Sequence, residues 1–149
     1  MNIQELLSAS RVKFHLTSNS KLDVINELIE VLNQDGKLLD KDKYKEAVLR
    51  REKEFSTGIG MGIAIPHAKD SSVKEAALTL GISKAGIDYE ALDGTLAHIF
   101  FLIAVPANSN DVHLKVLSYI SRKLMHQEIR DRLLSATTYE EVLAAFKEE

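Results

Sequence analysis

The sequence predicts an α/β fold, in which a central sheet of about four or five strands is covered by helices on its faces. Strand and helix patterns alternate along the chain until helical patterns alone finish it. The run LAHIFFLIAV, from Leu96 to Val105, is the most apolar in the chain and is typical of a strand buried on both faces. We therefore expect this run to form the centre of the sheet.

The elements before the glycine-rich region are an edge strand and two amphipathic helices. Residues Arg11 to Leu16 alternate enough for the strand. Ser20 and Asp23 form a capping pattern for the first helix, which Gly36 ends. Its apolar stripe comprises Leu22, Ile25, Leu28, Ile29 and Leu32. The second helix is capped by Asp40, and Arg51 lies one turn beyond Ala47 and Val48. The apolar stripe of this helix comprises Tyr44, Ala47, Val48 and Phe55.

The second half of the chain predicts two more strands and three helices. Ala76 to Ile82 is a strand, and Pro106 ends the central strand. Asn110 or Asp111 caps the next helix, whose repeating positions are Leu114, Leu117, Ile120, Ser121 and Leu124. Two further helices are expected over Gln127 to Ser135 and Thr138 to Phe146, the latter opened by a capping box of Thr138 and Glu141.

The composition fits one globular domain over residues 1–149 and excludes several function classes. The chain is 45% hydrophobic and 28% charged, which excludes disordered and collagen-like proteins. A net charge of −3 offers no broad footprint for nucleic acid or an anionic membrane. The absence of cysteine excludes disulfides, thiolate nucleophiles and Cys-type metal sites. Neither an export signal nor an apolar run of about 18 residues is present, so we expect a cytosolic, soluble protein.

A glycine-rich stretch, STGIGMG from Ser56 to Gly62, is the first candidate site. It lacks the third small residue of the dinucleotide fingerprint, and no Gly-Lys-Ser/Thr ends it as in a P-loop. A strand follows the stretch, whereas both phosphate-binding motifs continue into a helix. Two interpretations stay open, a flexible turn that joins helix to strand and a nest of amides that binds an anion.

Two of the five histidines stand out by position. His15 and His98 lie in strand patterns and His126 lies at a helix junction, so surface or core roles suffice for them. His67 follows Pro66, which fixes the backbone before it, close to the glycine-rich stretch. His113 lies in the first turn of a helix that follows the central strand, where α/β proteins place ligands. We expect His67 and His113 to converge.

Three chemistries would use this pair of histidines. A metal site with Asp111 as third ligand has no recognised spacing to support it. A general base for hydrolysis lacks a matching nucleophile. In the third, His67 itself takes a phosphoryl group on a ring nitrogen, which needs a neutral imidazole, an orienting partner and donors for the phosphate oxygens. The sequence supplies all three requirements nearby.

The stretch REKEFSTGIGMGIAIPHAK, from Arg51 to Lys69, resembles the signature of enzyme IIA domains of the bacterial sugar phosphotransferase system, in the fructose and mannitol class. The likeness continues through Gly86 to Tyr89, Leu92 to Gly94 and Asp111 to Leu114. The resemblance implies an α/β fold with a central mixed sheet and a phosphotransferase component that needs no cofactor or metal. It implies that HPr phosphorylates His67 on Nε2 and that His67 passes the group to a cysteine of an enzyme IIB.

The same resemblance assigns roles to further residues. His113 would assist the phosphorylated state, and Arg51 would contribute positive charge, with Arg50 as a competitor for that role. Ser56, Thr57 and the amides around Gly58 are candidates for binding the phosphoryl group, or they simply end the preceding helix. The apolar residues in and directly after the stretch, which are Ile59, Met61 and Ile63, either form part of a partner surface or belong to the core.

The details of the motifs favour the fructose class, although an IIA domain sees two partner proteins and never the sugar. Two alternatives remain open. One is a nitrogen-class regulatory IIA protein, which is phosphorylated at the same histidine and acts by binding targets. The other is a regulatory domain of this fold from a transcription activator. In the carrier role the domain would meet a membrane only indirectly, through IIB and IIC components, and it would bind no nucleic acid.

Overall fold

The apolar run forms the central strand, as expected. In the computed structural model, which describes residues 2–147, strand β6 spans Ala97–Pro106. It pairs antiparallel with β5 (Ala77–Ile87) on one side and parallel with β3 (Ile63–Ala64) and β4 (His67–Asp70) on the other. The sheet is therefore mixed, and every residue of β6 from Ile99 to Val105 is buried.

Strands β3 and β4 are two halves of one interrupted strand. Ile63 pairs with Ile99 and Ala64 with Phe100, and the pairing resumes with His67 beside Ile103 in the same register. The interruption falls at Ile65 and Pro66, where proline has no amide hydrogen to give to the ladder. Among residues 2–147 the six strands therefore fill the five places of the order β1, β5, β6, β3 and β2, in agreement with the predicted sheet.

The edges of the sheet differ from the sequence prediction in length. Strand β1 lies at the edge beside β5 but spans only Val12–Lys13, not Arg11 to Leu16. Arg11 ends a short 3₁₀ turn (Ala9–Arg11), and its buried guanidinium donates to the carbonyl of Leu78. A second 3₁₀ turn spans Ile3–Glu5. Strand β5 continues five residues beyond the predicted end at Ile82, after a register shift.

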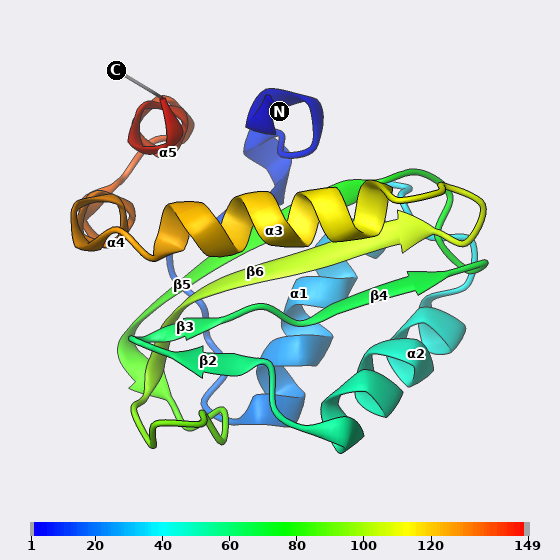
Figure 1. Cartoon of the computed structure of the whole chain (residues 1–149), viewed down its shortest axis with the longest axis horizontal. Helices are drawn as coiled ribbons and strands as arrows, with labels where there is room; N and C mark the ends of the chain where they lie inside the picture. The colour runs from blue at the N-terminus through cyan, green and yellow to red at the C-terminus, as the bar shows by residue number, and fades with distance from the viewer. Residues whose placement is uncertain (1, 148–149) are drawn as a thin grey trace.

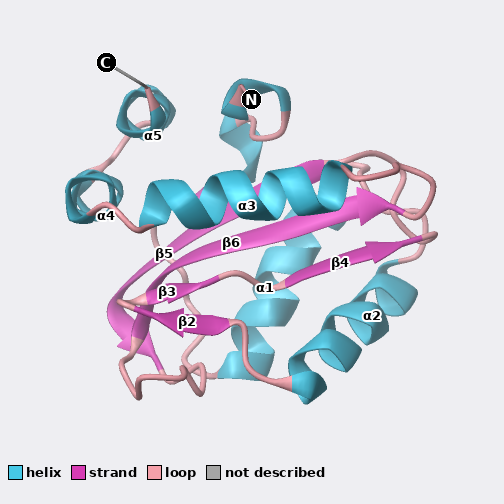
Figure 2. Cartoon of the chain, in the orientation of Figure 1, coloured by secondary structure: helices cyan, strands magenta, loops and turns pink. Residues whose placement is uncertain are grey.

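Helices cover both faces of the sheet (Figures 1 and 2). Helices α1 (Lys21–Gln34) and α2 (Lys41–Glu54) lie on one face. Helices α3 (Val112–Leu124), α4 (Gln127–Ser135) and α5 (Tyr139–Phe146) lie on the other. Alternate residues of β6 serve the two apolar clusters, because successive side chains of a strand point to opposite faces. Phe101 belongs to the cluster under α3 to α5, and Phe100 to the cluster under α1 and α2.

The predicted helix starts are confirmed by their caps. Side-chain oxygens of Ser20, Asp40 and Thr138 accept backbone N–H groups of Asp23, Lys43 and Glu141. Gly36 has a φ of +73° just after α1, which is the left-handed conformation of a helix stop. Asp111 precedes α3 without a side-chain cap. Among the described residues, no helix has both the length and the apolar character needed to span a bilayer.

Three residues of the predicted apolar stripes are exposed. Phe55 is 58% exposed because α2 ends at Glu54 and Phe55 lies beyond it in extended backbone. Leu114 is 65% exposed because the buried face of α3 runs through Val116, Ile120 and Leu124. Leu22 is half exposed, and Val24 is buried in α1 instead. Each of these expectations was therefore wrong.

Candidate functional site

His67 lies at the start of β4, directly after the interruption of the strand. Its side chain is largely buried, with the residue only 6% exposed, and Nδ1 lies 2.8 Å from the carbonyl oxygen of Ile65. A carbonyl can only accept, so Nδ1 carries the proton of this hydrogen bond. The neutral ring then presents an unprotonated Nε2, whose lone pair is free to attack an electrophile.

The backbone around the interruption explains why this carbonyl is available to the ring. The carbonyl of Pro66 accepts from the N–H of Ile103 in β6, so Ile65 faces the opposite way, and its N–H donates to the carbonyl of Thr57. Strand β2 (Gly58–Gly60) begins opposite Ala64, and before Gly58 the chain comes from α2. If β2 began earlier, one of its backbone N–H groups would donate to the Ile65 carbonyl. Nδ1 of His67 donates to that carbonyl instead.

His113, in the first turn of α3, lies against His67. The two ring centroids are 5.1 Å apart, with the planes tilted by 40°, so the expected convergence is confirmed. Nε2 of His113 is buried and has no hydrogen-bond partner within the described part of the chain. A buried polar atom without a partner is costly. An anionic group placed beside His67 would supply an acceptor for it.

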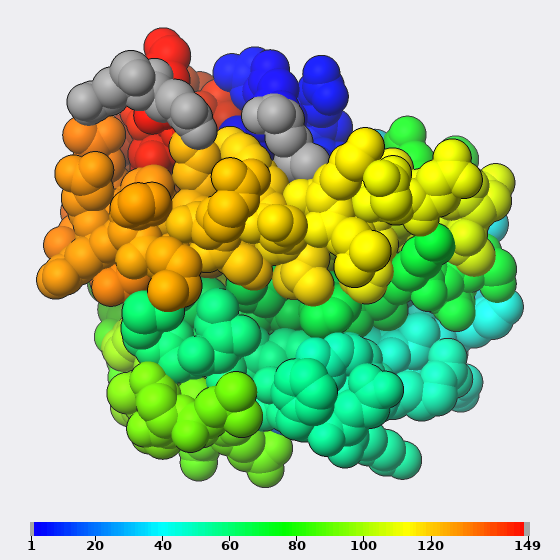
Figure 3. Space-filling view, in the orientation of Figure 1, coloured from blue at the N-terminus to red at the C-terminus, as the bar shows by residue number. Residues whose placement is uncertain are grey.

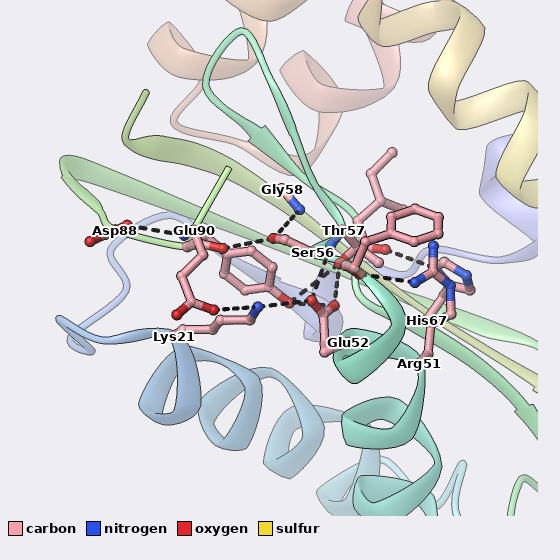
Figure 4. Close-up of polar contacts among 12 residues, drawn as sticks. Lys21, Arg51, Glu52, Ser56, Thr57, Gly58, His67, Asp88 and Glu90 are labelled. Carbon is pink, nitrogen blue, oxygen red and sulfur yellow. Dashed lines mark hydrogen bonds and ion pairs between the residues drawn. The ribbon is translucent and has the colours of Figure 1, made fainter. Parts of the chain in front are cut away.

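Arg51 brings positive charge to the same place from the last turn of α2. One guanidinium nitrogen donates to the carbonyl of Phe55 at 3.0 Å, and the guanidinium lies 4.2 Å from the centre of the Phe55 ring. Figure 4 shows Arg51 beside His67. The charge of Arg51 lowers the pKa of both His67 and His113, whereas Arg50 acts on the pKa of Asp70. Of the two competing arginines, Arg51 is the one at the site.

The surroundings of both histidines favour the neutral form by lowering the pKa of each ring. Burial is the largest cause that lowers the pKa of His67; the hydrogen bond with Ile65 and the charges of Glu52 and Glu54 oppose it, but the net pKa lies below the ordinary value of 6.5. Burial also lowers the pKa of His113, with contributions from His67, Lys69 and Arg51. Two neutral imidazoles beside a guanidinium suit a nucleophilic nitrogen with a neighbouring donor.

The glycine-rich stretch forms a β-hairpin and not merely a flexible turn, and the other interpretation, a nest of amides that binds an anion, stays a prediction. Strands β2 and β3 pair antiparallel around a turn at Met61 and Gly62. The N–H of Met61 donates to the carboxylate of Asp93 at 3.1 Å. Gly60 has a φ of +95°, and a Cβ there would lie 2.6 Å from the same carboxylate. The amide at the tip thus binds a side chain of the protein itself.

The candidate phosphoryl donors at the start of the hairpin already have partners. The hydroxyl of Ser56 donates to the carbonyl of Tyr89 and accepts the N–H of Gly58. The N–H and the hydroxyl of Thr57 both donate to the carboxylate of Glu52. The role of Ser56, Thr57 and Gly58 in binding a phosphoryl group therefore stays a prediction. Beside them, Ile59 and Met61 are exposed, as a partner surface requires, but Ile63 is buried in the core.

The sequence reasoning missed Glu52, the most highly connected side chain of the region (Figure 4). It is buried and accepts hydrogen bonds from Thr57 and from the hydroxyl of Tyr89, and it forms an ion pair with Lys21. A signal was present, because Tyr44, Val48 and Glu52 follow one another at intervals of four residues and so share a helix face. An acidic residue on an apolar face indicates a buried partner.

Lys69 is a second residue that the sequence analysis passed over. Its ammonium donates to the carbonyl of Asn110 at 2.8 Å and so ties β4 to the loop that precedes α3. Figure 3 shows α3 running across this face of the molecule. Among residues 2–147, no group of three or more side chains is arranged to hold a metal ion. Asp111 instead pairs with Lys115 at 3.4 Å.

Known proteins are similar to this chain in sequence and in fold. The fructose-specific EIIABC component of Bacillus subtilis is 48% identical over 143 residues, which are 96% of this chain and 22% of that protein. The fructose-specific EIIA component of Haloferax volcanii is 40% identical over 128 residues, covering 84% of this chain and 83% of that protein. This chain thus spans about a fifth of the length of the first relative and most of the second.

Solved structures confirm the fold. Nitrogen regulatory protein IIA-Ntr from Neisseria meningitidis matches with a TM-score of 0.88 at 31% identity, over 97% of this chain and 99% of that one. A complex of enzyme IIAMTL with phosphorylated enzyme IIBMTL from Escherichia coli matches with a TM-score of 0.81 at 23% identity, over 95% of this chain and 98% of that one. The family model described as "Phosphoenolpyruvate-dependent sugar phosphotransferase system, EIIA 2" matches residues 5–149. The chain therefore belongs to the EIIA 2 family of that phosphotransferase system.

Proposed function

We propose that this chain is a phosphohistidine carrier that accepts a phosphoryl group from phosphorylated HPr on Nε2 of His67 and passes it to a cysteine of an enzyme IIB. The hydrogen bond between Nδ1 of His67 and the carbonyl of Ile65 carries the proposal. It selects the tautomer in which Nε2 is the nucleophile, before any partner arrives.

Two displacements at phosphorus complete the transfer. In the first, the lone pair of His67 Nε2 attacks in line, an N–P bond forms, and the N–P bond of the donor breaks with its electron pair returning to the donor imidazole. In the second, a cysteine thiolate attacks, an S–P bond forms, and the electron pair of the Nε2–P bond returns to Nε2. The proton stays on Nδ1 throughout, hydrogen-bonded to the Ile65 carbonyl, so the steps balance without a cofactor.

His113 and Arg51 support the charge of the group in transit. Nε2 of His113 has no partner among the described residues and lies on a ring 5.1 Å from that of His67. Arg51 adds fixed positive charge from α2. A carrier must hold the group in a form that can still be transferred, so tight binding by many donors would slow the second step. A few donors therefore suit this role.

The names of the relatives support the partners and the sugar. The two fructose-specific relatives favour a role in fructose uptake, and the Escherichia coli complex favours an enzyme IIB as acceptor. Exposed Ile59 and Met61 supply apolar area near the site for such partners. We propose that the chain acts as a single cytosolic unit and meets the membrane only through IIB and IIC components.

The test is the intact mass of the protein after incubation with phosphoenolpyruvate, enzyme I and HPr. We expect one phosphoryl adduct that acid removes and that is absent from His67→Ala. His98→Ala is the matched control, because Nδ1 of His98 also lies 2.8 Å from a backbone carbonyl, that of Ser83. An adduct of the same yield on His67→Ala would contradict the proposal.

A regulatory role is the second candidate, favoured by the TM-score of 0.88 with the IIA-Ntr protein. The two roles differ in the second displacement. Phosphorylated protein is mixed with a fructose-class enzyme IIB, and the phosphoryl group is followed by mass. Transfer to the IIB cysteine supports the sugar carrier, whereas retention on His67 favours the regulator.

A further inference from the structure

Glu52 joins three parts of the chain beneath the site. Its side chain is 5% exposed. One carboxylate oxygen accepts the N–H of Thr57 at 3.0 Å and lies 3.1 Å from the ammonium of Lys21. The other accepts the hydroxyls of Thr57 and Tyr89. The buried carboxylate of Glu52 thus has a counter-charge in Lys21 and a hydrogen-bond donor on each oxygen. Lys21 also forms an ion pair with Glu90.

A path of hydrogen bonds leads from this carboxylate to the ring of His67. Glu52 holds the N–H of Thr57, and the carbonyl of Thr57 accepts the N–H of Ile65 at 3.0 Å. The carbonyl of Ile65 then accepts the Nδ1 hydrogen of His67 at 2.8 Å. Only the backbones of two residues therefore separate the buried acid from the imidazole.

This path runs through the point where the strand is interrupted. On one side, Ala64 pairs with Phe100, and on the other, His67 pairs with Ile103, so β6 fixes both flanks. Between them, the N–H and carbonyl of Ile65 point away from β6, toward Thr57 and His67. The orientation of the Ile65 peptide groups thus depends on where Thr57 lies, and Glu52 holds Thr57 through two hydrogen bonds.

We infer that Glu52 is a positioning residue for the acceptor nitrogen. By fixing Thr57, it keeps the Ile65 carbonyl against Nδ1 of His67 and so keeps Nε2 unprotonated. Its effect on phosphoryl transfer rests on the proposed function, whereas its effect on the tautomer of His67 does not. Glu52 makes no contact with the ring of His67; it acts through the position of Thr57, and its charge also raises the pKa of His67.

The tautomer is measured by nitrogen-15 NMR of the imidazole rings, with the His67 signals assigned from their loss in His67→Gln. We expect the wild type to hold the Nδ1–H tautomer alone. Glu52→Ala should give a mixture of both tautomers, because Thr57 loses its anchor. Glu52→Gln should retain the wild-type tautomer, since its amide oxygen still accepts the N–H of Thr57 and the threonine hydroxyl can rotate to accept from the amide nitrogen.

Two controls separate positioning from loss of stability. Glu90→Ala removes the other acidic partner of Lys21 without touching Thr57. Val142→Ala opens a cavity in the apolar cluster on the opposite face of the sheet. Both should keep the wild-type tautomer. If Glu52→Ala does not fold, Glu52→Met takes its place, because methionine fills a similar volume and has no carboxylate to accept the N–H and hydroxyl of Thr57.

The phosphorylation rate by HPr is the second readout. We expect it to fall on the order of tenfold in Glu52→Ala and to stay within about twofold of wild type in Glu52→Gln. A wild-type tautomer in Glu52→Ala or Glu52→Met overturns the inference, and so does a Glu52→Gln protein that behaves like Glu52→Ala. If the wild type accepts no phosphoryl group, the proposed function fails while the tautomer result still decides the role of Glu52.

Discussion

At the scale of single residues, the partner of His67 Nδ1 is a backbone carbonyl, which does not titrate. A backbone carbonyl has no proton to lose or gain in the range of pH where proteins are stable, unlike a carboxylate in the same place. The orientation of the His67 ring is thus independent of pH. In the proposed carrier, protonation of the ring itself is then what would stop Nε2 from acting as a nucleophile.

The lowered pKa of His67 predicts that its ring is protonated at a lower pH than an ordinary histidine. Because burial lowers the pKa below 6.5, Nε2 stays unprotonated as the pH falls through that value, and phosphoryl acceptance should persist there. An unfolded chain binds the proton first, so protonation of the histidines opposes folding. Stability is fully present above pH 6.5 and is lost as the pH falls through the folded pKa. NMR titration of His67 checks this, and a midpoint at or above 6.5 contradicts it.

His113 should affect onward transfer more than acceptance. In His113→Ala the phosphoryl group loses a donor next to His67, so we expect partial acceptance and a transfer to enzyme IIB that is slower by about tenfold to a hundredfold. Rapid-quench measurement of the transfer gives the rate. His113→Gln restores a donor and should recover part of it. A normal rate in His113→Ala would remove the residue from this role.

At the scale of elements, the sequence predicts well what depends on neighbours along the chain. The starts of α1, α2 and α5 rest on caps within three residues, and the buried strand β6 is itself one continuous apolar run. The hairpin of the glycine-rich stretch was not predictable in this way. Its tip is held by Asp93, about thirty residues further on, and local patterns do not show such a partner.

The same distinction holds for the site: local patterns predict some of its features, whereas others depend on partners far away in the sequence. The convergence of His67 and His113 follows from where each lies relative to predicted strands and helices. The choice of Arg51 over Arg50 needs the phase of the last turn of α2, which the structure alone supplies. Glu52 was missed because its partners come from α1, the start of the hairpin and the segment after β5.

Glu27 in α1 tests how one carboxylate holds a loop to a helix. It accepts hydrogen bonds from Thr17 and Ser18 and pairs with Lys13, and these bonds lower its pKa to about 2 against the opposing effect of burial. Glu27→Gln should lower the free energy of unfolding by about 1 to 3 kcal/mol at pH 7. The contribution is present above pH 4.5 and is lost as the pH falls toward about 2.

Urea denaturation of the wild type and Glu27→Gln across this range of pH gives the comparison. Glu30→Gln is the matched control on the same helix, because Glu30 also pairs with a lysine, Lys41, but at an exposed position. Its effect on the free energy of unfolding should be much smaller than that of Glu27→Gln, because an exposed ion pair contributes little to stability. Equal stability of Glu27→Gln and wild type at pH 7 would show that the loop needs no such anchor.

At the scale of the whole molecule, one strand connects two apolar clusters. Phe101 lies 5.7 Å from the ring of Phe146 on one face, and Phe100 lies 5.8 Å from Tyr89 on the other. Phe100→Ala and Phe101→Ala should each cost about 3 to 5 kcal/mol. Since both clusters share β6, each variant should still unfold in one transition, with fluorescence and circular dichroism reporting the same midpoint. Separate midpoints would mean that the two layers unfold independently.

The unchanged register across Ile65 and Pro66 also bears on the order in which donor and acceptor proteins bind to the proposed carrier. Both halves of the strand pair with β6 in the same register, so the backbone position of His67 is fixed, and the hydrogen bond to the Ile65 carbonyl fixes its ring. An imidazole held in this way does not move between two separate partner sites. For the proposed carrier, donor and acceptor must therefore visit the same nitrogen in turn, and each must leave before the other docks, which is a ping-pong exchange.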